Sequence, residues 1–204
     1  LDKKNFYING KWISPVEPKA YKVINPSNEE PCAEISIGGK KDVDKAVSAA
    51  KKAFETWAFT KKEERLELLE KLYVIYKKRW AEMAKLITLE MGAPMKFSTE
   101  MQAATGASHI KSFKNILKDF NFEKNLGDEK NNQKLLYEPK GVCALITPWN
   151  WPINQVNLKV IPALASACTV VLKPSEIAPL SSMLLAETPN PLNFCSDSML
   201  SHLA

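Results

Sequence analysis

Glycine is scarce in this chain, and its distribution limits the kinds of nucleotide site that the chain can form. Only seven of the 204 residues are glycine, and none follows Gly141. Phosphate-binding loops of the G-x-G-x-x-G and P-loop types need several glycines, because the backbone must turn tightly and approach the phosphates closely. Residues 142–204 can therefore hold neither loop, and any nucleotide site in this region must be of another kind or incomplete.

Arginine is scarcer still. Of the 28 basic residues only Arg65 and Arg79 are arginines, and the lysines are interleaved with Asp and Glu. Recognition of bases and phosphates relies on the planar guanidinium group, so no nucleic-acid partner is expected despite the formal net charge of +5. No membrane partner is expected either, because the longest apolar runs reach about six to eight residues and a bilayer span needs roughly 20.

Patterns of metal ligands are missing as well. His109 and His202 lie at no ligand spacing from a cysteine, so no metal site is predicted. The basic start of the chain is not followed by the apolar stretch of a secretory leader, and the expected location is the cytoplasm. No C-x-x-C pair occurs among the four cysteines, which are Cys32, Cys143, Cys168 and Cys195.

The remaining composition is that of an ordinary globular protein. With 45% hydrophobic and 25% charged residues, the chain can bury a sizeable core in one large or two modest domains. The first forty residues predict β-structure. Asn9-Gly10 separates extended runs at Phe6–Ile8 and Lys11–Ile13 and favours a two-residue hairpin turn, because both turn residues tolerate positive φ. A second ribbon is predicted from residues 21–24 and 33–37.

Two amphipathic helices are predicted after the ribbons. The first begins at Asp42 as its N-cap and runs to Trp57. The second begins with a capping box between Thr60 and Glu63 and continues about thirty residues to a stop at Gly92. The residues predicted to face the core are Val43, Ala46, Val47, Ala50, Phe54 and Trp57 in the first helix and Leu66, Leu69, Leu72, Tyr73, Tyr76 and Trp80 in the second.

A third helix over residues 98–117 and a hairpin over residues 120–140 are predicted next. Gly106 is expected to be a tolerated weak point of this helix. The hairpin is polar and interrupted by turn residues, and it is expected to protrude from the body of the protein. The inward face of the helix is predicted to consist of Met101, Ala104, Ile110, Phe113 and Leu117.

After Gly141 the pattern changes to that of a parallel sheet. Val142–Ile146 is a continuous apolar run, as a doubly buried strand requires, and residues 170–172 form another. The intervening residues suffice for a helix over 153–167, which predicts a right-handed βαβ unit. Ligands in such sheets bind at the carboxyl ends of the strands. Residues 147–150 and 173–176 are therefore predicted to converge on one site.

Several spaced blocks of the sequence resemble one family. Thr147-Pro148-Trp149-Asn150-Trp151-Pro152, then Lys159, then Thr169-Val170-Val171-Leu172-Lys173-Pro174-Ser175-Glu176 resemble the cofactor-domain signature of NAD(P)-dependent aldehyde dehydrogenases. Upstream blocks continue the resemblance, which covers the family's amino-terminal portion over about residues 5–187. The blocks are Phe6-Tyr7-Ile8-Asn9-Gly10-Lys11-Trp12, Ile24-Asn25-Pro26 and Asp42-Val43-Asp44-Lys45-Ala46-Val47.

The resemblance implies an α/β fold in which hairpins and a helical segment precede an incomplete Rossmann-type parallel sheet. Residues 1–120 would pack on the cofactor domain, and residues 121–139 would form the hairpin through which subunits of a homo-oligomer associate. Residues 140–187 would form the first βαβ unit of the NAD-binding domain, and residues 188–204 would be a divergent tail. Strands whose sheet neighbours are missing would leave unpaired edges.

The resemblance also assigns catalytic roles. Asn150 would donate its side-chain amide to the oxyanion of the tetrahedral adduct formed by the aldehyde, because that charge needs a preorganised donor. An ordinary turn Asn that caps the next helix is the alternative interpretation. Lys159 resembles a family lysine implicated in proton relay, although a lysine within a helix is usually only solvated.

Cofactor contacts are implied at both strand ends. Thr147 and Trp149 would line the nicotinamide half of the cleft. Lys173 and Glu176 would bind the adenosine ribose, unless this segment merely ends a strand and starts a helix. Pro148 and Ser175 are also expected to contact the cofactor. A carboxylate at position 176 would repel the additional phosphate of NADP, so the predicted cofactor is NAD, with NADP less favoured.

The family's nucleophilic cysteine, its general-base glutamate and its glycine-rich turn all come later in the family sequence than the position of Glu187. Cys143 and Cys168 are expected to be core residues, and Cys195 has no matching context. Pro189 and Pro191 interrupt the last helix, which suggests a frame change, an alternative end or a truncation.

The predicted function is oxidation of a small-molecule aldehyde with NAD(P), in a chain without turnover of its own. Two alternatives remain. One is a non-catalytic fragment that associates with full-length subunits, and the other is an incomplete dinucleotide-binding module.

Overall fold

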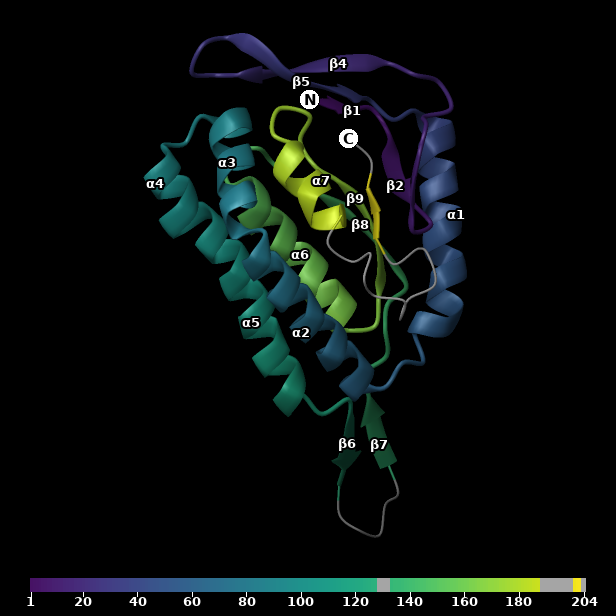
Figure 1. Ribbon diagram of the computed structural model, residues 1–204. Coiled ribbons are helices and arrows are strands. Elements are labelled where there is room, and N and C mark those ends of the chain that lie inside the picture. Colours follow the sequence, from purple (N-terminus) through teal and green to yellow (C-terminus); the bar gives the residue numbers. More distant parts are fainter. Residues whose placement is uncertain (128–132, 188–199, 203–204) are drawn as a thin grey trace.

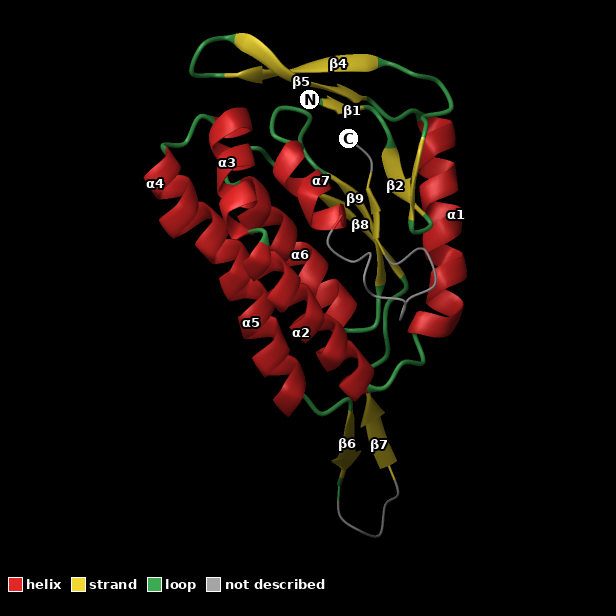
Figure 2. Cartoon of the chain, in the orientation of Figure 1, coloured by secondary structure: helices red, strands yellow, loops and turns green. Residues whose placement is uncertain are grey.

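The computed structural model describes residues 1–127, 133–187 and 200–202, the last three by their backbone alone. Its centre is a five-stranded sheet. The strands lie in the order β3 (Lys11–Ile13), β2 (Phe6–Ile8), β10 (Leu200–His202), β9 (Thr169–Lys173) and β8 (Val142–Ile146). Helix α1 (Lys40–Trp57) covers one face of the sheet (Figures 1 and 2). The other face is covered by a layer that contains α2 (Lys62–Lys78), α5 (Ala103–Asp119) and α6 (Pro152–Ala165). Alternate residues of β9 serve the two faces: Val170 and Leu172 join the core with α6, and Val171 packs with Ala46 and Ala50 of α1.

Both predicted β-ribbons are confirmed. Strands β2 (Phe6–Ile8) and β3 (Lys11–Ile13) are antiparallel. Their turn residues Asn9 and Gly10 have φ angles of 54° and 71°, the left-handed conformation that a tight hairpin turn requires. Strands β4 (Ala20–Asn25) and β5 (Glu30–Ser36) form the second ribbon. Strand β1 (Asp2–Lys3) pairs parallel to β5 and completes a separate three-stranded sheet.

The predicted start of the first helix is wrong by a few residues. Helix α1 spans Lys40–Trp57 with Gly39 as its N-cap, so Asp42 lies within the first turn. Its buried carboxylate accepts the N–H groups of Gly39 at 3.0 Å and of Val16 at 2.8 Å, and so ties the helix start to the preceding loop. Val43, predicted to face the core, is 41% exposed.

The predicted long second helix consists of two helices. Helix α2 spans Lys62–Lys78 and α3 spans Trp80–Met91, with a break at Arg79, whose φ and ψ are −98° and 12°. The predicted capping residues are also displaced by one position, because the Lys61 N–H donates to Glu64 Oε2 at 2.7 Å. The predicted stop is confirmed: Gly92 ends α3 in the left-handed conformation.

The predicted third helix is preceded and partly replaced by other turns. A short helix α4 (Met95–Phe97) and a π-helical turn η1 (Ser98–Gln102) precede α5 (Ala103–Asp119). The wider turn displaces the apolar stripe, and Met101 is 47% exposed rather than inward. Gly106 is not a weak point. A Cβ at this position would lie 2.3 Å from the Tyr76 hydroxyl, so close packing of α5 on α2 requires glycine.

A hairpin projects from the helical end of the protein, as predicted (Figure 1). Its strands β6 (Glu123–Leu126) and β7 (Gln133–Leu136) are antiparallel, and their residues are exposed. The tip of the predicted hairpin lies outside the described residues. At the base, Phe120 packs edge to face on Phe122 and Tyr137. Arg65 connects this aromatic group to the body of the protein, because its guanidinium lies over the Phe122 ring and donates to the Ala165 carbonyl.

The predicted βαβ unit is confirmed. Strand β8 (Val142–Ile146), helix α6 (Pro152–Ala165) and strand β9 (Thr169–Lys173) follow in order, and the two strands are parallel. Helix α6 ends two residues before the predicted Ala167, which has a φ of 61°. Strand β8 is not doubly buried as predicted: it is an edge strand, and Ile146 is 72% exposed.

Strand β9 is not an unpaired edge, which corrects the expectation of missing neighbours on this side. Strand β10 (Leu200–His202), from the region expected to be a divergent tail, pairs parallel to β9 and antiparallel to β2. Helix α7 (Leu180–Glu187) follows β9 and is buried along nearly its whole length. The remaining part of the predicted tail lies outside the described residues.

Candidate functional site

The two polar segments predicted to converge lie side by side at the carboxyl ends of β8 and β9. The Thr147 N–H donates to the Lys173 carbonyl at 3.3 Å, one step beyond the last ladder pair, Ile146 with Lys173. Parallel pairing therefore places the residues after β8 beside the residues after β9. This is the edge at which α/β sheets bind ligands.

The segment after β8 combines one buried residue with three exposed ones. Thr147 is 4% exposed, and its hydroxyl oxygen has no hydrogen-bond partner in the structure. Pro148, Trp149 and Asn150 are exposed. Trp151 occupies the N-cap position of α6, and no side chain caps this helix end. Asn150 therefore does not occupy the capping position that the alternative interpretation gave it.

The segment after β9 holds an ion pair. Lys173 Nζ lies 2.7 Å from Glu176 Oε2, and roughly two fifths of each side chain is exposed. The hydrogen bond from Lys173 lowers the pKa of Glu176, so the carboxylate stays charged at neutral pH. Ser175 shapes the turn: its hydroxyl accepts the Ile177 N–H at 3.3 Å, and its carbonyl accepts the Ala178 N–H at 3.2 Å.

Lys159 lies on α6 at some remove from these groups. Its ammonium approaches Gln155 Oε1, one helical turn earlier, at 3.5 Å. No contact in the described part of the chain joins Lys159 to Asn150 or to the Lys173–Glu176 pair. The structure thus brings the predicted cofactor residues together at one edge and leaves Lys159 apart from them, about two turns into the helix that begins there.

Sequence reasoning missed several residues that border the site. Phe97 of α4 packs edge to face on Trp151, with 5.6 Å between ring centroids. His109 Nε2 lies 2.7 Å from Asn154 Oδ1, across the interface of α5 and the first turn of α6. The residues around His109 carry no sequence signal of a partner 45 positions later, so the sequence does not predict this contact.

Two of the described cysteines, Cys143 and Cys168, lie away from the candidate site. Cys168 is 4% exposed and precedes β9, and Cys143 is near the start of β8, so both lie toward the amino ends of the strands. Burial raises the pKa of the Cys143 thiol, which disfavours the thiolate. Cys168 is a core residue, as predicted, and Cys143 packs against the core. Cys195 lies outside the described residues.

In residues 1–127, 133–187 and 200–202, no helix combines the length and apolar character that crossing a membrane requires.

The fold is a mixed α/β architecture in which the carboxyl ends of parallel strands β8 and β9 lie side by side. The comparisons with known proteins define its family. The chain belongs to the aldehyde dehydrogenase family, whose family model matches residues 12–191. It is 48% identical over 186 residues to a 3-succinoylsemialdehyde-pyridine dehydrogenase of a Pseudomonas species, an alignment that covers 91% of this chain and 38% of that protein. It is 39% identical over 181 residues to a putative aldehyde dehydrogenase of Staphylococcus aureus strain MW2, with 89% and 37% covered.

Solved structures give the same result. An aldehyde dehydrogenase from Bartonella henselae superposes with a TM-score of 0.95 at 52% identity and covers 100% of this chain and 42% of its own. Aldehyde dehydrogenase C from Pseudomonas syringae, solved with NAD+ and octanal, superposes with a TM-score of 0.93 at 38% identity, with 98% and 40% covered. The resemblance to the amino-terminal portion of this family is thereby confirmed. The chain spans about 38% of the length of the curated relatives that it matches.

Proposed function

We propose that this chain carries the oxyanion donor and the adenosine-ribose contacts of an NAD-dependent aldehyde dehydrogenase. The observation that carries the proposal is the meeting of two segments at one sheet edge: the exposed Asn150 after β8 and the Lys173–Glu176 pair after β9. The relative from Pseudomonas syringae, solved with NAD+ and an aldehyde, supports the same class of ligands.

Asn150 is suited to stabilise negative charge. It lies two residues before Pro152, the first residue of the 14-residue helix α6, so it stands at the positive end of a helix dipole. A side-chain amide donor beside that end would stabilise the oxyanion that develops when a nucleophile adds to the aldehyde carbonyl. Replacement of one such donor typically slows turnover by about a hundredfold to a thousandfold.

The Lys173–Glu176 pair fits a ribose diol. The charged carboxylate can accept two hydroxyl hydrogen bonds, the ammonium can donate one, and both side chains are accessible at the end of β9. Thr147 adds a buried hydroxyl without a partner at the neighbouring strand end. NAD, when bound, supplies the acceptor for the hydride that leaves the substrate. Glu176 would repel a 2′-phosphate, so we propose NAD rather than NADP.

Lys159 is proposed to move protons near this edge. It lies on the helix that starts beside Asn150, and among the described residues its ammonium approaches the neutral side chain of Gln155. An ammonium without a carboxylate partner keeps its protons available for exchange with water or with a reacting group.

The thiol nucleophile and the general base are proposed to come from outside the described residues. Cys143 and Cys168 lie toward the opposite ends of the strands, and neither can reach a carbonyl placed beside Asn150. In the family sequence both groups follow the position of Glu187, and this chain spans about 38% of the length of its relatives, so we expect it to form no NADH from NAD and an aldehyde. Detectable NADH formation by the purified, sequence-verified chain would contradict this part of the proposal.

Titration of the chain with ADP-ribose, followed by nuclear magnetic resonance, tests the cofactor site. We expect shifts of the amide signals of Thr147, Lys173 and Glu176, and weakening of binding by about tenfold or more in Glu176→Gln, because hydrogen bonds to a charged group are lost. Glu123→Gln, on the exposed hairpin, is the matched control and should bind as the parent does. Equal weakening in both variants, or shifts confined to other regions, would exclude this site.

The projecting hairpin is proposed to mediate association between subunits. Every residue of β6 and β7 is exposed, and Leu126, Leu136 and the following Tyr137 are 47%, 56% and 41% exposed. Such a run of large apolar side chains is unfavourable in water and is typical of a contact surface. Leu136→Lys should lower the association state in sedimentation, whereas Lys124→Glu at the opposite strand should leave a purely apolar contact largely intact.

A further inference from the structure

Helix α7 is held at both of its ends by side chains from α3, and this arrangement bears on the Lys173–Glu176 pair. Residues 180–186 of α7 are buried, and the helix follows directly after the turn that carries Glu176. The first contact is made by Glu90, near the end of α3, and the second by Arg79, at its start. The two helices thus run in opposite directions, with a charged contact at each end.

Glu90 binds the amino end of α7. It is 1% exposed, and its carboxylate accepts the N–H groups of Leu180 and of Ser181, the latter at 3.0 Å. The first N–H groups of a helix have no partner within the helix, so Glu90 serves as a cap supplied by another helix. No ion pair joins Glu90 to a cation in the described part of the chain. The titratable group that faces it from β5 is the Cys32 thiol, whose pKa is raised by burial first and by Glu90 in addition.

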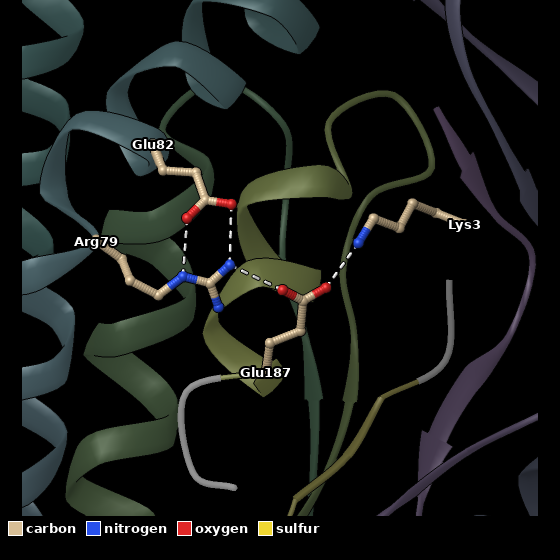
Figure 3. A network of polar contacts seen from close by, with 4 residues as sticks. All are labelled: Lys3, Arg79, Glu82 and Glu187. Atoms are coloured by element: carbon tan, nitrogen blue, oxygen red, sulfur yellow. Dashed lines mark hydrogen bonds and ion pairs between the residues drawn. The ribbon is translucent and has the colours of Figure 1, made fainter. Parts of the chain in front are cut away.

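The carboxyl end of α7 is held in a different way, through its last residue, Glu187 (Figure 3). Its carboxylate pairs with Arg79 at 2.9 Å and with Lys3 at 2.6 Å, and Arg79 also binds Glu82 through two nitrogens. A carboxylate at the carboxyl end of a helix opposes the helix dipole, and the two cations offset this cost. Lys3 belongs to β1, so this contact also ties the first strand to α7.

The turn between β9 and α7 is fixed by burial and by backbone hydrogen bonds. Pro174, Ala178 and Pro179 are buried, and the Ser175 carbonyl accepts the Ala178 N–H at 3.2 Å. The Pro179 carbonyl in turn accepts the Met183 N–H at 2.9 Å, which joins the turn to the first turn of α7. Displacement of the amino end of α7 would therefore be transmitted to Glu176, which lies four residues before Leu180.

We propose that Glu90 is a positioning residue for the adenosine end of the cofactor site: by capping α7 it fixes the turn at residues 174–179 and thereby the Lys173–Glu176 pair. This inference rests on the proposed function, because it assigns a second residue to the same ribose contact. Glu90 touches no ligand in this arrangement and acts through the backbone of α7. Since the amino end of α7 is already occupied by a carboxylate, it is not available to bind a cofactor phosphate.

The stability of the contact between Glu90 and the amino end of α7 should depend on pH. Burial raises the pKa of Glu90 to about 7, although the N–H groups of Leu180 and Ser181 act in the opposite direction. In a state in which α7 moves away and water reaches the carboxyl group, its pKa returns toward 4.5. The closed state therefore binds the proton more tightly than the open state, and opening becomes easier as pH rises from about 4.5 to about 7. Glu187 and Glu176 have lowered pKa values and stay charged over this range.

Amide hydrogen exchange of the full chain between pH 5 and pH 8 tests the capping role. After correction for the intrinsic exchange rate, protection at Leu180, Ser181 and Ala178 should fall by up to roughly tenfold per pH unit as pH rises toward 7, and then level off. Glu90→Gln is neutral at every pH and keeps one oxygen that can accept an N–H group, while its amide nitrogen cannot accept the other. It should therefore lose part of the protection and all of its pH dependence. Glu82→Gln, on the same helix but exposed, should follow the parent profile. Retention of the pH dependence in Glu90→Gln would overturn the proposal.

Binding of ADP-ribose separates this inference from the proposed function. If the proposals both hold, affinity falls with rising pH in the parent chain and not in Glu90→Gln. If the parent chain binds ADP-ribose with the same pH profile as Glu90→Gln, Glu90 does not position the pair and the inference fails while the function stands. If no binding occurs at any pH, the proposed function fails. Hydrogen exchange at Ile177 and Ala178 still decides whether Glu90 fixes the turn, because Glu90→Ala removes both acceptors. Unchanged exchange there in Glu90→Ala would overturn the inference.

Discussion

Two regions of the protein use their polar groups in opposite ways. Where α2, α5 and α6 meet, Tyr76 donates to the Ala103 carbonyl at 2.8 Å and Asn157 donates to the Gly106 carbonyl at 2.9 Å, and these groups are almost fully buried. At the strand ends, Asn150 is exposed and the Lys173–Glu176 pair is half exposed. At the helix interface the polar groups form buried hydrogen bonds within the protein, whereas at the strand ends they remain accessible to a ligand. Substitutions at the helix interface should therefore change mainly the free energy of unfolding, and substitutions at the strand ends should change mainly ligand binding.

The largest expected loss of stability comes from Gly106→Ala. The added Cβ would lie 2.3 Å from the Tyr76 hydroxyl and 3.2 Å from Ile153, inside a close-packed interface. Overpacking of this kind costs about 1–3 kcal/mol in the free energy of unfolding. Urea denaturation should show the loss, and Ser108→Ala, at an exposed position of the same helix, is the control. Equal stabilities of the two variants would show that α5 can shift away from α2.

A double-mutant cycle identifies the atom responsible for that loss. Tyr76→Phe alone should cost about 1 kcal/mol, because it removes a buried hydrogen bond to the Ala103 carbonyl. It also removes the hydroxyl oxygen that the Cβ of Ala at position 106 would meet. The double variant should therefore be more stable than the sum of the two single losses predicts, by about 1 kcal/mol. Strict additivity would place the strain elsewhere, at Ile153.

The same two regions differ in how far the sequence could predict them. The strand ends were predictable because local signals suffice there: apolar runs at Val142–Ile146 and around Val170 mark strands, and parallel pairing places their carboxyl ends together. The Asn9-Gly10 turn and the stop at Gly92 are equally local, since each depends on a residue that tolerates positive φ.

The helix interface could not be predicted in this way. Gly106 resembles a weak helical residue until Tyr76, thirty positions earlier, is known to pack against it. Glu90 has the sequence context of an ordinary exposed helical carboxylate, and only tertiary packing buries it against α7. The break at Arg79 contains neither proline nor glycine, so the periodicity continues across it and predicts one long helix.

A smaller effect is expected at the ion pairs of Glu187, which lie between the two extremes in burial. Burial acts to raise the pKa of Glu187, but the hydrogen bonds and charges of Lys3 and Arg79 outweigh it and lower the pKa below 4.5. A lowered carboxyl pKa adds stability that is present above the unfolded value and is lost as pH falls through the folded one. The parent chain should thus lose more stability than Glu187→Gln in urea denaturation between about pH 5 and pH 3, by up to about 1 kcal/mol.

The smallest effect on stability is expected at the candidate site itself. Exposed ion pairs contribute about 0–1 kcal/mol, because water screens them and two long side chains must be ordered. Glu176→Gln should therefore change the free energy of unfolding by less than about 0.5 kcal/mol, even though it weakens ADP-ribose binding. A large loss of stability in this variant would mean that Glu176 serves mainly to build the turn after β9. Unchanged stability with weakened binding would instead separate the ligand contact from the fold, as the comparison of the two regions requires.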